Sequence, residues 1–324
     1  MAPQGRVKRI ERALSELVEE LASEAKGKLE RHGYSVVMLE SPRSSANRSI
    51  DLLASGGERR LHVKVTLDAE SLDQRDLGDL AGFARTIRSA PLVVCEYVGR
   101  IDVHDDVIYE RGGVPAVSIS TLDPLLRGDR SLYVIGRRAN FYVRIDGEKL
   151  REKREELGLS LGRVADALGV SRKAVYEYER NAFDVEIEVA EKLVELFGED
   201  ITKPYRLFDE EEWPKLPRSL EPDNKLEKKV LEMLSPRGVT YHAKKTFADV
   251  LMTTRSKRLI ITIEHSKSSS TIEEKINELR KLRGMDDICR VVVSRKESAS
   301  ENEILYVTED TMDKLKTLLD EEEL

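Results

Sequence analysis

GEKLREKREELGLSLGRVADALGVSRKAVYEYERNAFDVEIEVAEKLVELFG, residues 147 to 198, decides the fold of the middle of this sequence. Apolar residues recur there at helical spacing in four short blocks, and serine or glycine stands between the blocks. Ser160 and Ser171 are placed to cap the second and third helices, and Gly169 to end the second. A fourth helix is expected at about 186 to 197. Its predicted core residues are Val189, Leu193 and Leu196.

The third helix is the candidate for contact with another molecule. Ala174, Val175 and Tyr178 are expected to face inward, which leaves the other side chains on a short, N-capped rod. A rod of that width fits the major groove of DNA, where the residues at its N-terminus meet base edges and phosphates. The predicted DNA-binding residues are Arg163, Ser171, Arg172, Lys173, Tyr176 and Arg180.

This stretch resembles the Cro/repressor class of helix-turn-helix domains, also called the xenobiotic-response-element class. The matching residues are the opening LREKREELGLS (150–160), the turn A-x-x-L-G-V-S (165–171) and the exit Y-x-x-E-R-N (176–181). The resemblance implies binding to double-stranded DNA. It departs at Leu161 and Gly162, because family members often carry glutamine at the start of the second helix. The alternative is a helical bundle with charged outer faces that never meets DNA.

Charge restricts how DNA could be bound. The chain has 54 basic and 61 acidic residues and a net charge of -7, so any attraction to DNA must be local. No apolar run approaches the length of a membrane span and no signal peptide is recognisable. We therefore expect a cytoplasmic protein without a membrane contact. No phosphate-binding glycine loop is present, and neither a cofactor nor a metal is expected.

Alternating strands and helices flank the helical stretch and predict α/β modules. Before it, the predicted elements are a helix at 7–31, strands at 34–39, 50–54 and 60–66, a helix at 77–89, and strands at 91–98 and 114–120. After it, they are a helix at 224–234, strands at 248–252 and 258–264, a helix at 272–282, and strands at 288–294 and 304–307. The predicted fold class is multidomain α/β plus all-α. The predicted domains are an α/β module (1–145), the helix-turn-helix domain (146–200), a linker (201–223) and a second α/β module (224–324).

The two flanks can be aligned without a gap in their central strands. Ile50-Asp51-Leu52-Leu53 pairs with Ala248-Asp249-Val250-Leu251, and the stretch 60–65 pairs with 258–263. The aspartate precedes the aligned leucine of the next strand by ten residues in both copies. We interpret this as a duplication, with one α/β module on each side of the helical domain.

The order of elements in each module, with Asp51 opening one strand and Lys64 on the next, resembles the restriction-endonuclease-like and Holliday-junction-resolvase fold. In active members an aspartate, and a glutamate two residues before the lysine, hold a divalent cation. Here His62 stands in the place of that glutamate, and Ile260 and Thr262 replace the corresponding residues of the second copy. The resemblance therefore implies degenerate nuclease modules, and no catalytic residue is predicted.

Two functions remain open. The first is a sequence-specific DNA-binding transcriptional regulator that acts as a homodimer on two half-sites, because one short helix reads few base pairs. Its flanking modules would hold the dimer, recruit a protein partner or sense an effector. The second is a nuclease centred on Asp51 and Lys64 and targeted by the helical domain. The missing glutamate favours the first, and the domain order resembles archaeal predicted transcriptional regulators with such a domain in mid-chain.

Overall fold

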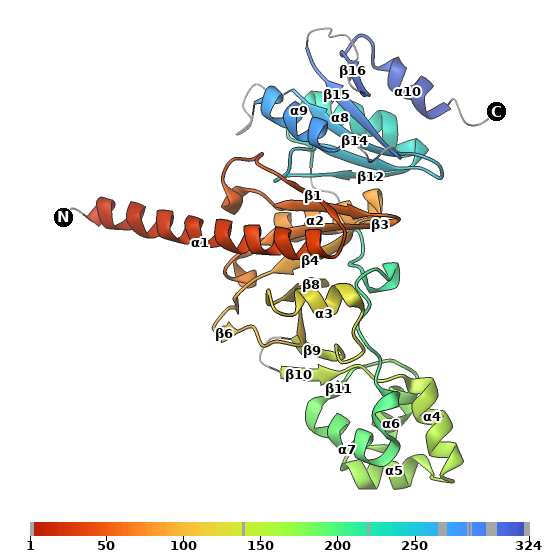
Figure 1. The fold of residues 1–324 in the computed structure, drawn as a ribbon. Coiled ribbons are helices and arrows are strands. Elements are labelled where there is room, and N and C mark those ends of the chain that lie inside the picture. The colour runs from red at the N-terminus through yellow and green to blue at the C-terminus, as the bar shows by residue number, and fades with distance from the viewer. Residues whose placement is uncertain are drawn as a thin grey trace.

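The computed structural model describes residues 3–137, 140–218, 221–264, 271–283, 285, 287–295 and 303–320. Figure 1 shows an elongated molecule with the second α/β module at one end, the first in the middle and the helix-turn-helix domain at the far end. The predicted fold class, α/β modules around an all-α domain, is confirmed. No described helix has both the length and the apolar character needed to cross a membrane.

The first module is built on a large mixed sheet. Within the described residues it has nine strands in the order β1-β2-β3-β4-β8-β7-β9-β10-β11. Their bounds are β1 Ser35–Met38, β2 Leu52–Gly56, β3 Arg59–Val65, β4 Ala90–Val94, β7 Val107–Arg111, β8 Val114–Val117, β9 Val134–Arg137, β10 Asn140–Val143 and β11 Val185–Glu186. Strands β5 (Tyr97–Val98) and β6 (Ile101–Asp102) form a separate hairpin.

Helices cover both faces of this sheet. α1 (Pro3–Arg31) and α3 (Leu122–Arg127) share a hydrophobic core with one face, to which Leu29 and Leu122 contribute fully buried side chains. α2 (Gln74–Ile87) covers the other face and begins with a capping box between Asp73 and Asp76. The sheet is therefore buried on both sides in its parallel part, as its near-continuous apolar strands require.

The second module repeats this arrangement on a smaller scale. Its described sheet has five strands in the order β12-β13-β14-β15-β16. The elements are α8 Lys225–Leu234, β12 Val239–His242, β13 Val250–Thr253, β14 Arg258–Ile263, α9 Ile272–Lys281, β15 Ile288–Val293, β16 Ile304–Val307 and α10 Asp313–Asp320. β12, β13 and β14 pair antiparallel and β14, β15 and β16 parallel, which matches β1-β2-β3 and β3-β4-β8 of the first module.

The aligned aspartates occupy the same place in the two sheets. Asp51 donates its backbone N–H to the carbonyl of Val63 (2.8 Å), and its Oδ2 accepts from the N–H of Val65 (2.8 Å). Asp249 makes the same two contacts with Ile261 (2.9 Å) and Ile263 (2.6 Å). The ungapped alignment of the two copies is thus also an alignment in space.

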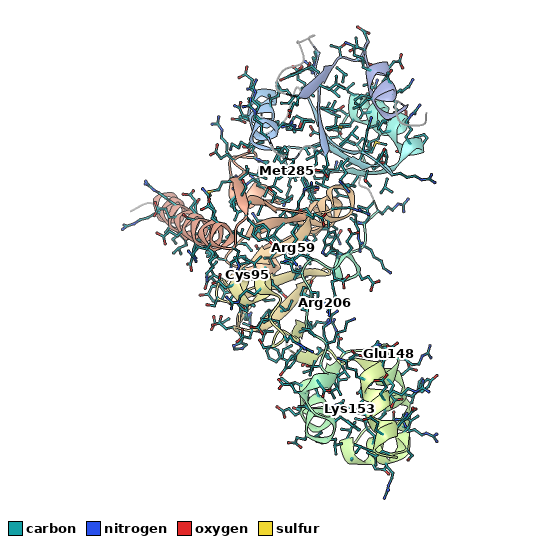
Figure 2. All side chains as sticks on the ribbon, turned by 45° about the vertical axis from the view of Figure 1, so that its right-hand side comes forward. Arg59, Cys95, Glu148, Lys153, Arg206 and Met285 are labelled. Carbon is teal, nitrogen blue, oxygen red and sulfur yellow. The ribbon has the colours of Figure 1, made fainter. Side chains whose placement is uncertain are left out.

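The two modules share one hydrophobic core, because helices α2 and α9 lie between the two sheets. Phe83 of α2 and Leu282 after α9 belong to the same buried cluster as Tyr241 and Phe247 of the second module. Met285, labelled in Figure 2, lies at this junction and is buried in the same cluster. The modules therefore fold against each other as one body.

Reciprocal contacts across this junction follow a two-fold pattern. In the first module, Asp79 of α2 accepts hydrogen bonds from the backbone N–H groups of Lys244 (2.9 Å) and Lys245 (2.7 Å). In the second, Glu278 of α9 accepts from the N–H of Glu40 (2.9 Å), which is the counterpart of Lys244. Such exchange of equivalent contacts is the mark of an isologous interface. The duplicated chain therefore forms a pseudo-dimer within itself.

The helix-turn-helix domain is attached through the first sheet. Its helices are α4 Gly147–Glu156, α5 Leu161–Leu168, α6 Arg172–Glu179 and α7 Ile187–Phe197. β11 comes between α6 and α7 and pairs with β10, so the sheet extends into this domain. Leu193 is buried in the domain core as predicted, whereas Leu196 is exposed and Phe197 is buried instead.

The segment 201–223, predicted as a linker, connects the helical domain to the second module and also packs on the first. Tyr205, Leu207 and Trp213 are buried in the core beneath α1. Arg85 of α2 donates to the carbonyl groups of Trp213 (2.6 Å) and Pro214 (2.8 Å). This part of the segment is therefore packed against the first module. Short 3-10 helices occur at Ser45–Asn47, Ala69–Ser71, Glu199–Ile201, Glu210–Glu212 and Ser235–Arg237.

Candidate nucleic-acid interface

The turn between α5 and α6 is formed by the capping residues that the sequence predicts. Ser160 accepts a hydrogen bond from the N–H of Arg163 (3.2 Å), and Ser171 accepts from the N–H of Ala174 (3.1 Å). Gly169 ends α5 in the left-handed conformation with φ of 72°. These contacts satisfy helix-end donors and set the angle between the two helices.

α6 is held in place by contacts with α4 that the sequence alone did not assign. The Arg154 guanidinium forms an ion pair with Glu179 that includes a 3.1 Å Nη2–Oε2 bond, and both side chains are largely buried. Asn181 has positive φ, and its Oδ1 accepts from the N–H of Gly147 (2.8 Å). A Cβ atom on Gly147 would lie 2.5 Å from the carbonyl oxygen of Tyr178. The signal for these roles was present in the Y-x-x-E-R-N exit, whose Glu and Asn fix α6 against α4.

All six predicted DNA-binding residues lie on the exposed surface of α5, α6 and their flanks. Arg172 and Lys173 occupy the first turn of α6, next to the Ser171 cap. Tyr176 is 45% exposed, and the Arg180 guanidinium lies 5.4 Å from the centre of its ring. Val175, in contrast, is fully buried as predicted. The structure thus brings these residues together at the end of the molecule away from the second module (Figure 1).

Ion pairing distinguishes this surface from helix α4. The four basic residues of α4 are each paired with a carboxylate: Lys149 with Asp146, Arg151 with Glu155, Lys153 with Asp200 and Arg154 with Glu179. Figure 2 labels Lys153 on this helix. Arg163, Arg172, Lys173 and Arg180 form no ion pair with a residue that the structure describes. These four cations keep their full charge available for phosphate.

The departure from the family pattern at the start of α5 has a structural explanation. Leu161 is half-buried and packs against the core of the domain. The Cβ position of Gly162 is near only the Ser160 hydroxyl, at 3.7 Å. These two residues therefore supply packing and space where family members often place a glutamine.

In the nuclease-like site of the first module, the Asp51 carboxylate is bonded to neighbouring protein groups. Oδ1 of Asp51 accepts from the Ser45 hydroxyl (2.9 Å) and from Arg48 Nε (2.9 Å), while Oδ2 lies 3.1 Å from Lys64 Nζ and accepts from the Val65 N–H. Mg²⁺ needs carboxylate oxygens that are free to coordinate it. Both oxygens of Asp51 are committed to protein donors, so this site does not fit the metal of the fold family.

His62 takes no part in a metal site either. Its Nε2 atom lies 2.9 Å from the carbonyl oxygen of Leu80, and the ring contacts Phe83. Burial lowers the pKa of His62 to about 3, so the ring is neutral at physiological pH. Burial likewise lowers the pKa of Lys64, against the opposing effect of Asp51. The nuclease-like site therefore holds a buried ion pair between Asp51 and Lys64, next to the neutral, packed ring of His62.

The second module has replaced the site with a different pair. Lys275 Nζ of α9 lies 2.7 Å from Asp249 Oδ1, and Thr262 donates its hydroxyl to the carbonyl of Phe247 (3.0 Å). The lysine thus comes from a helix and not from the strand that carries it in the first module. The prediction that this copy has lost the nuclease residues agrees with this geometry.

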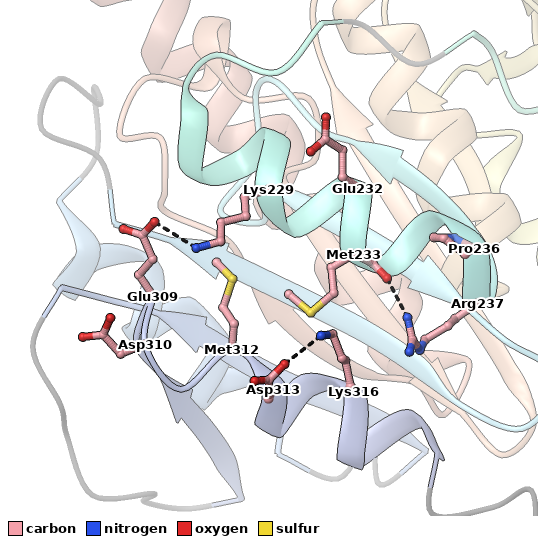
Figure 3. Close-up of a pocket in the computed structure, with 10 residues that line it drawn as sticks. All are labelled: Lys229, Glu232, Met233, Pro236, Arg237, Glu309, Asp310, Met312, Asp313 and Lys316. Carbon is pink, nitrogen blue, oxygen red and sulfur yellow. Dashed lines mark hydrogen bonds and ion pairs between the residues drawn. The ribbon is translucent and has the colours of Figure 1, made fainter.

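Further pockets and one side-chain cluster among the described residues could accept a ligand. A 560 Å³ pocket beside Lys64 is walled by Leu14 and Val18 of α1. A 410 Å³ pocket between α8 and α10 has paired charges, among them Lys229 with Glu309 at 3.1 Å (Figure 3). Among the described residues, one group has metal-ligating atoms within 4.8 Å of one another. It consists of Asp223, Glu227 and His242, and the sequence analysis did not find it.

The carboxylates of that group already have cationic or donor partners. Lys244 Nζ lies 2.7 Å from Asp223 Oδ1, and His242 Nε2 lies 3.0 Å from Glu227 Oε2. An ammonium group this close to the open side of the cluster disfavours a second cation there. Of the surfaces considered, that of α5 and α6 is the one that presents several cations without a described ion pair, Arg163, Arg172, Lys173 and Arg180.

Comparison with known proteins supports both parts of this description. A model of the PD-(D/E)XK superfamily domain matches residues 18–131, and a helix-turn-helix model matches residues 150–203. These matches confirm the nuclease-like fold of the first module and the helix-turn-helix domain. No solved structure matches the chain.

Archaeal relatives match over most of their length, and their names provisionally assign them as HTH-type transcriptional regulatory proteins. A protein of Aeropyrum pernix is 35% identical over 247 residues, which cover 74% of either chain. One of Pyrococcus horikoshii is 31% identical over 86% of this chain and 88% of its own length. One of Sulfolobus acidocaldarius is 30% identical over 87% of this chain and 94% of its own. The chain therefore belongs to this family of archaeal HTH-type proteins.

Proposed function

We propose that the protein is a sequence-specific DNA-binding transcriptional regulator and that α6 reads the major groove. The observation that carries this proposal is that Arg163, Arg172, Lys173 and Arg180 form no ion pair among the described residues, whereas all four basic residues of α4 are paired. Each cation that meets a phosphate releases condensed counterions, which supplies affinity at physiological salt.

The proposed roles differ along the surface. Arg172, Lys173 and Tyr176 would meet base edges, because they lie in the first turns of α6. Arg163 on α5 and Arg180 at the end of α6 would hold phosphates and fix the register of the helix. The Ser171 hydroxyl would add a phosphate contact beside the N-terminus of α6, where the helix dipole favours negative charge.

We further propose that the chain acts as a homodimer on two half-sites. An eight-residue helix reaches only a few base pairs, which is too few for useful specificity. The internal duplication doubles the nuclease-like module, whereas only one helix-turn-helix domain is found among the described residues. A second reading helix therefore has to come from a second chain.

The test begins with selection of duplex sites from a random pool, since the operator is unknown. Binding of the selected duplex is then measured by fluorescence anisotropy over a range of salt. Arg172→Ala and Lys173→Ala should each cost about 1 to 3 kcal/mol on the selected site. Arg163→Ala should lower the salt slope by about one and weaken all sequences alike.

Arg151→Ala is the matched control, because this exposed arginine of the same domain already pairs with Glu155 at 3.0 Å. It should leave affinity and salt slope unchanged. Equal effects of Arg172→Ala and Arg151→Ala would refute the recognition surface. A site without two-fold symmetry, bound by one chain, would refute the dimer while leaving the recognition helix in place.

The alternative function, a nuclease, is tested with the same purified protein. We propose that the first module does not cut DNA, because Asp51 is saturated by Ser45, Arg48, Lys64 and Val65. Plasmid and junction DNA incubated with Mg²⁺ or Mn²⁺ should remain intact. Cutting that disappears in Lys64→Ala would overturn this part of the proposal.

A further inference from the structure

The N-terminal half of α1 reaches beyond the body of the molecule. Figure 1 shows the helix running across the first module and past its edge. Leu21, Ala25 and Leu29 are buried against the sheet, whereas Ile10, Leu14 and Leu17 are exposed to 52%, 46% and 49%. A helix that is well packed in one half thus presents large apolar side chains to solvent in the other.

These exposed side chains belong to one regular stripe. Ile10, Leu14, Leu17 and Leu21 are separated by four, three and four residues, which is the spacing of the core positions in a coiled coil. Leu21, at the end of the stripe, is already buried by the protein itself. The stripe therefore continues from the buried half of α1 into its exposed half, where Leu14 also borders the pocket beside Lys64.

Charge beside the stripe is divided along the helix. Arg9 and Arg12 stand at its N-terminal end, and Glu16, Glu19 and Glu20 follow toward the C-terminal end. All five are exposed, and Arg12 pairs with Glu16 within the helix at 3.0 Å. An identical helix laid antiparallel would place its basic turn beside the acidic turn of the first. A parallel arrangement would set like charges side by side.

We propose that this part of α1 is an isologous interface that binds α1 of a second copy of the chain in antiparallel orientation. The inference rests on the homodimer of the proposed function and names the surface that holds it. Two-fold pairing makes the same patch serve both chains, as closed dimers require. Because residues 21–29 fix the helix on the sheet, little ordering is needed when the overhanging turns meet.

Pairing through α1 would also join two copies of the helix-turn-helix domain in one dimer. The contacts between the modules are already used within each chain, between α2, α9 and the two sheets. α1 lies on the opposite face of the first sheet and is free of that junction. The second copy thus binds to a surface that the internal pseudo-dimer leaves open.

The experiment measures the oligomeric state of the full chain by sedimentation velocity at micromolar concentration and without DNA. Leu14→Glu combined with Leu17→Glu should weaken the dimer by roughly tenfold or more, because the interface would have to bury charge. Val239→Glu is the matched control, since this residue is 49% exposed on the second module. It should not change the dimer. Circular dichroism and thermal melting of each variant establish that the fold is retained.

A charge exchange tests whether the partner of α1 is α1 of a second chain. Arg9→Glu with Arg12→Glu gives one variant with an acidic helix, and Glu16→Arg with Glu19→Arg gives another with a basic helix. Each alone should be monomeric, and an equimolar mixture should form heterodimers. A wild-type chain that is monomeric, or a dimer that survives Leu14→Glu with Leu17→Glu, would overturn the proposal.

DNA binding is measured on the same proteins to keep the two ideas apart. Monomeric Leu14→Glu with Leu17→Glu should still bind a single half-site and should lose the extra affinity for two. If the chain forms the α1 dimer but no variant binds DNA, the recognition proposal fails and the α1 interface stands. If the Leu14→Glu, Leu17→Glu variant remains a dimer and binds DNA with the affinity of the wild-type chain, the α1 interface is refuted. The recognition proposal then stands.

Discussion

Replacement of Gly82 by alanine tests the packing between the two modules most directly. Gly82 is buried on α2, and a Cβ atom there would lie 2.3 Å from Cδ1 and 2.6 Å from Cε1 of Tyr241. The Tyr241 ring is 1% exposed, and its hydroxyl lies 3.3 Å from Asp79 Oδ1. The ring has no open space to move into, so the added methyl group has to push the second module away from α2.

The magnitude follows from two opposing effects. Alanine in place of glycine within a helix gains about 1 kcal/mol in intrinsic propensity. Overpacking of a full core costs about 1 to 3 kcal/mol, and loss of the Tyr241 contact with buried Asp79 adds about 1 to 3 kcal/mol. We expect Gly82→Ala to lower the free energy of unfolding by about 1 to 5 kcal/mol.

Gly27→Ala in α1 is the matched control, because a Cβ atom there meets only Arg31 Nη1 at 3.7 Å. It should raise the unfolding free energy by up to about 1 kcal/mol. Both variants are compared by urea denaturation. In a Tyr241→Ala background the clash disappears, and Gly82→Ala should become neutral or stabilising. Equal stabilisation by Gly82→Ala and Gly27→Ala in the wild-type chain would refute the reasoning.

Two other predictions concern buried charge. Burial raises the pKa of Asp79 to about 6, so between about pH 4 and 6 the folded state binds a proton that the unfolded state releases, and stability falls as pH rises. Relative to Asp79→Asn, the wild type should lose roughly 1 kcal/mol of unfolding free energy between about pH 5 and about pH 7.5 in urea titrations; a parallel course of the two proteins would contradict this. Arg154→Ala leaves the largely buried Glu179 without its guanidinium and should destabilise the helix-turn-helix domain by about 3 kcal/mol or more. Hydrogen exchange of residues 147–198 measures this, with exposed Arg151→Ala expected to change protection by less than about 1 kcal/mol.

Local signals made the helix-turn-helix domain predictable. Ser160, Ser171 and Gly169 act through hydrogen bonds and dihedral angles within a few residues, so their effects are visible in the sequence. The same holds for the duplicated strands, since the Asp51 and Asp249 contacts reach only to the next strand. These features need no knowledge of the rest of the chain.

The missed elements depend on distant parts of the chain. β7 pairs in parallel with β9, and β11 has two residues that form a strand only because β10 lies beside them. The acidic segment after the helical domain read as a linker because its apolar residues are widely spaced, yet Trp213 is buried in the first module. Such pairing and packing leave no regular period in the sequence.

The sequence likewise did not predict how the two modules are oriented relative to each other. Tyr241 fills the space left by Gly78 and Gly82 of α2, although about half the chain separates them. Asp287 contacts both Arg60 and its counterpart Arg258, which no alignment of the two copies would indicate. The sequence shows that there are two copies, and side-chain packing determines how they meet.

The duplication also bears on why the nuclease-like residues were free to change. α2 and α9 lie in the shared core, so the residues beside the former site now contribute to stability: His62 bonds to α2, and Lys275 of α9 neutralises Asp249. Restoring a glutamate at His62 would bury a carboxylate against the Leu80 carbonyl, which is strongly unfavourable. An ion pair between Asp51 and Lys64 therefore stabilises the scaffold, while the exposed cations of α5 and α6 are the groups that we propose to bind DNA.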